Sequence, residues 1–109
     1  MSLDLDPNVE DIVTALWAFG NVGTYSSCGG HSEPTLAQVP EGRFYVGFVV
    51  EADAKGWESL ERITRAAGEV LAEVAAWWDG GLNFELRGDG DVDRDALVQL
   101  LQEAAIPPS

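Results

Sequence analysis

The sequence predicts one small α/β or α+β domain over residues 1–109, with three helices packed on a small mixed sheet of three to four strands, in the order αββαβα. Three observations support this class. The chain has 109 residues, of which 46% are apolar, enough for one domain to bury its own core. Apolar residues recur at helical spacing near both ends and in the middle. Shorter stretches between them are rich in β-branched and aromatic residues.

The first helix is expected to start at Pro7 and to end at Gly20. Asp6 can cap it, and Pro7 suits the first helical position. Its apolar stripe consists of Val9, Ile12, Val13, Leu16 and Phe19. Residues 22–27 then form a short strand, which brings Cys28 to the end of the strand where a loop begins.

The loop over residues 28–42 contains three glycines and two prolines and has little periodicity. It is longer than the usual ~4 to 6 residues, and long loops in compact domains tend to be functional or mobile. Residues 43–51 form the clearest strand, because both sets of alternating positions contain apolar residues. This pattern suggests burial on both faces at the centre of the sheet.

Residues 55–78 predict one long helix, because apolar side chains, three tryptophans among them, recur there at helical spacing. A rival interpretation ends the helix at Gly68 and forms a strand over residues 70–78, followed by a hairpin turn at Asp79-Gly80. The alanines of this stretch favour the helix. Whether residues 69–78 are helix or strand stays open at this point.

Residues 82–87 alternate between apolar and polar side chains, as in a half-buried strand whose polar face either lines a cleft or simply meets solvent. A polar turn over residues 88–91 leads to a last helix that is capped by Asp91 or Asp93 and stopped by two prolines. The strand, long helix and strand between residues 43 and 87 suggest a right-handed βαβ crossover, hence a mixed sheet.

Composition limits the classes of partner. Six basic against nineteen acidic residues give a net charge of −13, which disfavours binding to nucleic acid and to anionic membranes. The charge suits a cationic partner, and it also simply keeps a protein soluble. No apolar run approaches the ~18 residues of a membrane span, and the acidic start lacks the features of a signal peptide. The single cysteine cannot form an internal disulfide, so we expect a cytoplasmic protein.

The loop that follows the first strand holds the only cysteine, Cys28, and the only histidine, His31. A thiol becomes nucleophilic when a cation or backbone N–H groups stabilise its thiolate, and Gly29-Gly30 can present such groups. His31 can serve as the base, so these two residues are the catalytic candidates. The ligand-binding candidates are Ser26, Ser27, Gly29 and Gly30. The alternative is a buried cysteine beside a surface histidine.

Metal binding is also conceivable at this loop, because a Cys-x-x-His spacing can supply two zinc ligands. A closed site needs four ligands and the chain has no second pair, although Glu33 can add an oxygen or two subunits can share Cys28 and His31. The acidic run over residues 89–95 fails the EF-hand pattern in both registers and suits a helix N-terminus instead. We therefore expect no metal, and the cofactor stays unknown.

Four tryptophans are many for a domain of this size. On a helix, Trp77 and Trp78 would point about 100° apart, so that both cannot face one narrow core stripe. One of them is therefore expected near the surface. Exposed indoles are common in interfaces, which suggests a homodimer, with a ligand cleft as the lesser alternative.

The stretch Ser26-Ser27-Cys28-Gly29-Gly30-His31 resembles the Ser-Ser-Cys-x-Gly loop of the wybutosine-synthesising tRNA methyltransferases, which use S-adenosylmethionine. The match covers about six to eight of the 109 residues and would carry over Ser26, Ser27, Cys28 and Gly30. The family's arginine after the glycine is replaced here by His31, which removes a phosphate contact. The same stretch also resembles small uncharacterised bacterial proteins with a Ser-Cys-x-Gly-His loop after an N-terminal helix.

These observations predict a small acidic, dimeric domain that binds a small ligand or a cationic protein partner through the loop over residues 26–31. Two alternatives remain. One is a thiol-dependent or methyltransferase-like enzyme centred on Cys28 and His31. The other is a purely structural interaction domain.

Overall fold

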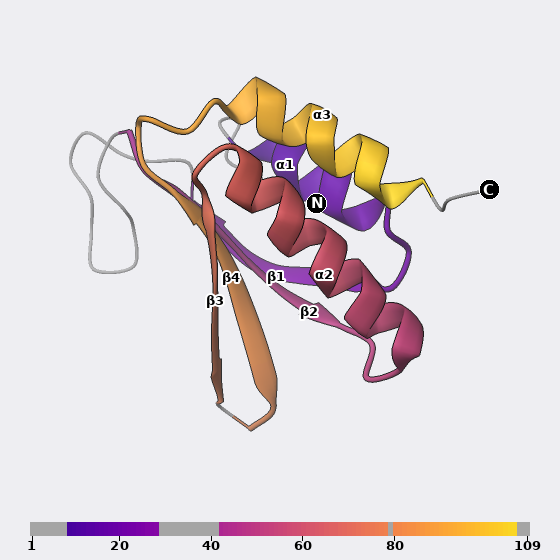
Figure 1. The fold of residues 1–109 in the computed structure, drawn as a ribbon. Coiled ribbons are helices and arrows are strands. Elements are labelled where there is room, and N and C mark those ends of the chain that lie inside the picture. Colours follow the sequence, from indigo (N-terminus) through magenta and orange to yellow (C-terminus); the bar gives the residue numbers. More distant parts are fainter. Residues whose placement is uncertain (1–8, 29–41, 79, 107–109) are drawn as a thin grey trace, which may run out of the picture.

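The computed structural model describes residues 9–28, 42–78 and 80–106, which form three helices and one four-stranded sheet (Figure 1). The elements in chain order are α1 (Glu10–Trp17), β1 (Val22–Cys28), β2 (Phe44–Val50), α2 (Ala54–Glu69), β3 (Glu73–Trp78), β4 (Leu82–Gly88) and α3 (Arg94–Ala105). The expected α/β class is confirmed, with the order αββαββα in place of αββαβα.

The sheet has the strand order β1-β2-β4-β3, and each neighbouring pair is antiparallel. The three helices lie together on one side of it, and the opposite face is not covered by any described helix (Figure 1). The hairpin of β3 and β4 extends beyond the helices at its tip (Figure 1). One face of the sheet therefore meets the core, and we call the other the open face.

The expected long helix over residues 55–78 is wrong. The rival interpretation, a helix followed by a strand, is right, although the helix ends at Glu69 and the strand begins at Glu73. Helix α2 ends at Glu69, and its last carbonyls accept hydrogen bonds from the N–H groups of Leu71 and Ala72. Leu71 adopts a positive φ of 63°, which turns the chain out of the helix. β3 then pairs with β4 over its whole length, so that strand pairing overrides the helix preference of the alanines.

The extra strand also explains why the βαβ crossover and the mixed sheet do not form. Because β3 reverses the chain once more before β4, β4 runs antiparallel to β2 and lies directly beside it. The expected burial of residues 43–51 on both faces is wrong for the same architectural reason. With the helices on one side, Tyr45 is half-buried and Val49 is exposed on the open face.

The helix boundaries follow local capping. Helix α1 begins at Glu10 with Val9 at the N-cap position, and the expected cap Asp6 and the expected first helical residue Pro7 lie outside the described residues. Gly20 follows the helix with a positive φ of 77°. Asp53 and Asp93 cap α2 and α3 by accepting hydrogen bonds from the backbone N–H groups of Gly56 and Ala96. Of the two candidates for the last cap, Asp93 is thus the residue used.

The core lies between the sheet and the helices. At its centre the rings of Phe48 and Phe84 stack with their centroids 5.5 Å apart. The largest fully buried side chains around them are Phe44, Ile12, Leu16, Ile63, Leu86, Leu97 and Leu101. Among the described residues, no helix is both long and apolar enough to cross a bilayer.

Candidate functional site

The strand register places one row of residues across the open face, from the end of β1 to the start of β3. Cys28 pairs with Tyr45, Tyr45 pairs with Arg87, and Arg87 pairs with Glu73. Residues that pair across antiparallel strands point to the same face, which is why Tyr45, Arg87 and Glu73 can meet. The row lies where β1 ends and shortly after the point where the described chain resumes at Gly42.

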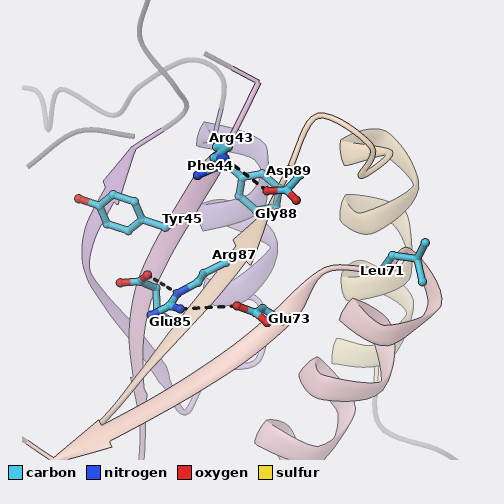
Figure 2. A pocket seen from close by; sticks show the side chains of 9 residues that line it. All are labelled: Arg43, Phe44, Tyr45, Leu71, Glu73, Glu85, Arg87, Gly88 and Asp89. Atoms are coloured by element: carbon cyan, nitrogen blue, oxygen red, sulfur yellow. Dashed lines mark hydrogen bonds and ion pairs between the residues drawn. The ribbon is translucent and has the colours of Figure 1, made fainter. Parts of the chain in front are cut away.

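A cavity of about 450 Å³ occupies this end of the sheet. Its polar lining comes from β2, β3, β4 and the residues next to them, as Figure 2 shows. The lining residues are Arg43, Phe44, Tyr45, Leu71, Glu73, Glu85, Arg87, Gly88 and Asp89. Its volume lies within the range of sites that hold small molecules or a few side chains of a partner.

Ion pairs organise the charged side chains of the cavity. Arg87 lies between two carboxylates (Figure 2): its Nε donates to Glu85 at 2.6 Å, and its Nη1 is 3.5 Å from Glu73. The hydrogen bond to Glu85 is the main reason why the pKa of Arg87 is raised above its ordinary value. Nε of Arg43 lies 3.5 Å from a carboxylate oxygen of Asp89. Three carboxylates against two guanidinium groups give the described part of the lining a net negative charge.

Tyr25 borders the same acidic region from β1. It sits at a β-bulge between Thr24 and Ser26, and its ring crosses Gly47 of β2. Its hydroxyl donates a hydrogen bond to the backbone carbonyl of Phe84 in β4, at 3.3 Å. Burial raises the pKa of Tyr25 above 10.0, and the negative charge of Glu85 and the neighbouring Tyr45 raise it further. Tyr25, Tyr45 and Glu85 therefore lie within electrostatic reach of one another on the open face.

The structure places only part of the loop predicted as the site. Ser26 is exposed, and its Oγ lies 3.2 Å from the hydroxyl of Tyr45, a residue of the cavity. Ser27 is half-buried in β1 and pairs with Val46. Cys28 ends β1 as expected, and its backbone alone is described. The remaining candidates, Gly29, Gly30 and His31, lie outside the described residues, as does Glu33.

Sequence reasoning missed most of the cavity. The sequence did not decide whether the polar face of residues 82–87 lines a cleft or meets solvent. The structure shows that Glu85 and Arg87 line a cavity. The alternation in this strand was the available signal. Nothing comparable pointed to Glu73, because the expected helix placed it on a different element. Nor did any local pattern bring Arg43 and Asp89 together across β2 and β4.

The expectation that one of Trp77 and Trp78 lies near the surface is correct, but the helical geometry from which it was argued is wrong. Trp78 is 77% exposed and Trp77 is half-buried. These two residues are neighbours on a strand, where successive side chains point to opposite faces, and not on a helix. Trp57 is also exposed, near the start of α2.

Comparison of the chain with known proteins does not indicate what this site binds or which reaction it carries out. No family model matches the chain, and no curated protein or solved structure matches it either. Within residues 9–28, 42–78 and 80–106, no three His, Cys, Asp or Glu side chains are grouped so that they could hold a metal ion. The cavity of the open face is thus interpreted from its own geometry and charge.

Proposed function

We propose that the protein is a binding domain that holds a cationic segment of a partner protein in the cavity of the open face. One observation carries this proposal: the open face of the sheet has a cavity of about 450 Å³ where, among the described residues, Glu73, Glu85 and Asp89 meet two arginines. In the cytoplasm, a net charge of −13 would steer a basic segment towards the protein.

The side chains beside the cavity suit a basic group. Glu73 and Asp89 are exposed, with side chains 69% and 73% accessible, so that both can accept a hydrogen bond from a guest without prior unfolding. Tyr25 and Tyr45 offer aromatic rings near Glu85, and a ring next to a carboxylate is a favourable setting for an ammonium or guanidinium group. Arg87 holds the carboxylates of Glu73 and Glu85 in position before the basic segment binds.

Leu71 supplies an apolar edge to the same cavity. It is 84% exposed, and it holds a left-handed backbone conformation that costs a residue with a side chain roughly 1–2 kcal/mol. Glycine is the usual residue at this position after a helix. In the proposed complex, this exposed leucine packs against the aliphatic stem of a bound lysine or arginine.

An NMR titration tests this function. The probe is a synthetic peptide that alternates lysine and alanine, and the control peptide alternates glutamate and alanine. We expect amide shifts from the basic peptide alone, concentrated at Tyr45, Glu73 and Glu85. Glu85→Gln should weaken binding about 10-fold, since a hydrogen bond to a charged group contributes about 1.5 kcal/mol.

Glu61→Gln is the matched control, because it removes the same charge from an exposed position on α2, outside the cavity. Its affinity for the basic peptide should stay within about twofold of that of the unmodified protein. Equal weakening by Glu61→Gln and Glu85→Gln would show that only net charge attracts the peptide, and would overturn the proposed site.

A thiol-dependent reaction is the second candidate, because the backbone of Cys28 lies opposite Tyr45 at the end of the row that lines the cavity. The test is the rate of Cys28 alkylation by iodoacetamide as a function of pH, in the unmodified protein and in His31→Ala. A midpoint well below the ~8.5 of a free thiol, lost in the variant, supports a thiolate paired with His31. Slow alkylation of both proteins, relieved only by denaturant, excludes this second candidate and leaves the binding domain.

A further inference from the structure

The two edges of the sheet are built differently. β1 is one edge, and it carries a β-bulge at Thr24/Ser26 together with three polar residues near its end, Thr24, Ser26 and Ser27. β3 is the other edge, and it pairs with β4 in an unbroken register. Natural sheets protect their edges with bulges, lysines or prolines, and β3 has none of these devices.

The residues of β3 make this edge apolar as well as regular. Its one charged residue, Glu73, lies at the start of the strand and forms an ion pair with Arg87. The following residues, Val-Ala-Ala-Trp-Trp, carry no charge in a protein of net charge −13. At the far end, the last residue of β3, Trp78, is 77% exposed, and the first residue of β4, Leu82, is 40% exposed.

We propose that β3 pairs with β3 of a second copy of this chain, antiparallel about a two-fold axis at Ala76, to form a continuous eight-stranded sheet. Residues that face each other in an antiparallel pair must point to the same side of the sheet. On β3, residues 73, 75 and 77 share the open face, and residues 74, 76 and 78 share the other, by their pairing with β4. Only registers that pair positions of equal parity keep the two sheets continuous.

The register centred on Ala76 gives the best fit of side chains. Trp77 then faces the partner's Ala75 on the open face, and Trp78 faces the partner's Val74 on the other face. Each indole meets a smaller side chain, and Ala76 meets the partner's Ala76 at the axis. The register centred on Ala75 would instead place Trp77 against the partner's Glu73 and leave the large side chain of Trp78 without an opposite residue in β3. In the register centred on Ala76 the residue without an opposite in β3 is Glu73.

A second copy fits this edge better than a basic segment does. A basic partner would gain no ion pair from residues 74–78, which carry no charge, whereas two strongly acidic molecules repel each other least where a neutral strip forms the contact. The alternation of small and large side chains along β3 is also self-complementary, as a two-fold interface requires. The interface is separate from most of the open-face cavity, since only Glu73 of β3 lines it.

Charge variants at Ala76 test both the dimer and its register. Ala76 is exposed, so that Ala76→Glu and Ala76→Lys should fold normally, with melting temperatures close to that of the unmodified protein by circular dichroism. We expect the unmodified protein to be a dimer by sedimentation equilibrium. Each variant alone should be a monomer, because two like charges would face each other at the axis. An equimolar mixture of the two variants should restore the dimer.

Gln99→Glu and Gln99→Lys are the matched controls, because Gln99 is exposed on α3 and remote from β3 in sequence and in the fold; both should remain dimeric. An unmodified protein that stays monomeric would overturn the proposal and leave the edge to another partner. Dimers that persist in both Ala76 variants would place the interface elsewhere. Monomers in the equimolar mixture would overturn the register centred on Ala76.

Discussion

The ring of Tyr25 lies directly over Gly47, so that a Cβ atom on Gly47 would be only 2.7 Å from Cζ of the tyrosine. The bulge in β1 makes this crossing possible, because it places Tyr25 as an extra residue opposite β2. The hydroxyl then reaches the carbonyl of Phe84, one strand further on. One side chain thus ties β1, β2 and β4 together on the face that no described helix covers.

We expect Gly47→Ala to destabilise the protein by about 1–3 kcal/mol, because the new methyl group must displace the Tyr25 ring. Gly23→Ala is the control: it lies on β1, and its Cβ would meet Val49 Cγ2 at 3.7 Å, an ordinary contact. The free energy of unfolding is measured by urea denaturation. Equal stability of the two variants would mean that the ring moves aside at no cost.

Tyr25→Ala identifies the cause of the loss in Gly47→Ala. If the clash with the ring is responsible, Gly47→Ala should cost much less in the Tyr25→Ala background than in the unmodified protein. The difference between these two costs is the coupling free energy of the pair. Full additivity would assign the effect of Gly47→Ala to β2 alone.

Alanine substitutions at two glycines of α2 should change the free energy of unfolding in opposite directions. A Cβ on Gly56 would overlap the carbonyl carbon and oxygen of Glu51, so we expect Gly56→Ala to cost about 3 kcal/mol or more. Gly68 has no atom within 4 Å of its Cβ position, so Gly68→Ala should stabilise the helix by about 0.5–1 kcal/mol. Thermal and urea unfolding of both variants provide the measurement. A loss of stability in Gly68→Ala would contradict the end of α2 described above.

Leu71→Gly should make the protein more stable and, at the same time, weaken its binding of the basic peptide. Removing the left-handed strain is expected to stabilise the protein by about 1 kcal/mol, because an 84% exposed side chain gives up little burial. Leu71→Ala is the control, since it shortens the side chain and keeps the strain. Both variants should bind the lysine–alanine peptide more weakly. If neither variant weakens binding, Leu71 is not part of the site.

Stability should fall at alkaline pH through Tyr25. The folded protein raises the pKa of this phenol above its ordinary value of 10.0, chiefly by burial. The contribution of Tyr25 to stability is therefore complete below pH 10 and is lost as the pH rises through the folded pKa, because the unfolded chain releases its proton first. The readout is phenolate absorbance together with urea unfolding across this range.

Tyr25→Phe should remove that part of the alkaline loss. Glu85→Gln should shift the Tyr25 titration towards 10.0 without reaching it, since the charge of Glu85 contributes less to the shift than burial does. A titration of Tyr25 that Glu85→Gln leaves unmoved would show that the carboxylate does not face the ring.

Short-range patterns in the sequence determined most of the secondary-structure elements and the fold class. The sequence predicted the α/β class, the apolar stripe of α1, and the strands around residues 22–27, 43–51 and 82–87. It also predicted that an aspartate, either Asp91 or Asp93, caps α3, and the structure selects Asp93. Each depends on residues within one or two turns of helix or a few positions of strand. Net charge, which limits the class of partner, likewise needs no structure.

Tertiary structure decided the conformation of residues 73–78, the direction of the strands in the sheet and the position of the cavity. Residues 73–78 combine three helix formers, a glutamate and two alanines, with three strand formers, a valine and two tryptophans. They become β3 because pairing with β4 offers their backbone a complete ladder. That one change turned a mixed sheet into an antiparallel one and placed an apolar strand at its edge. The cavity depends on it as well, since Glu73 meets Arg87 only across paired strands. Contacts between residues distant in the chain are set by register and packing, which local sequence patterns do not encode.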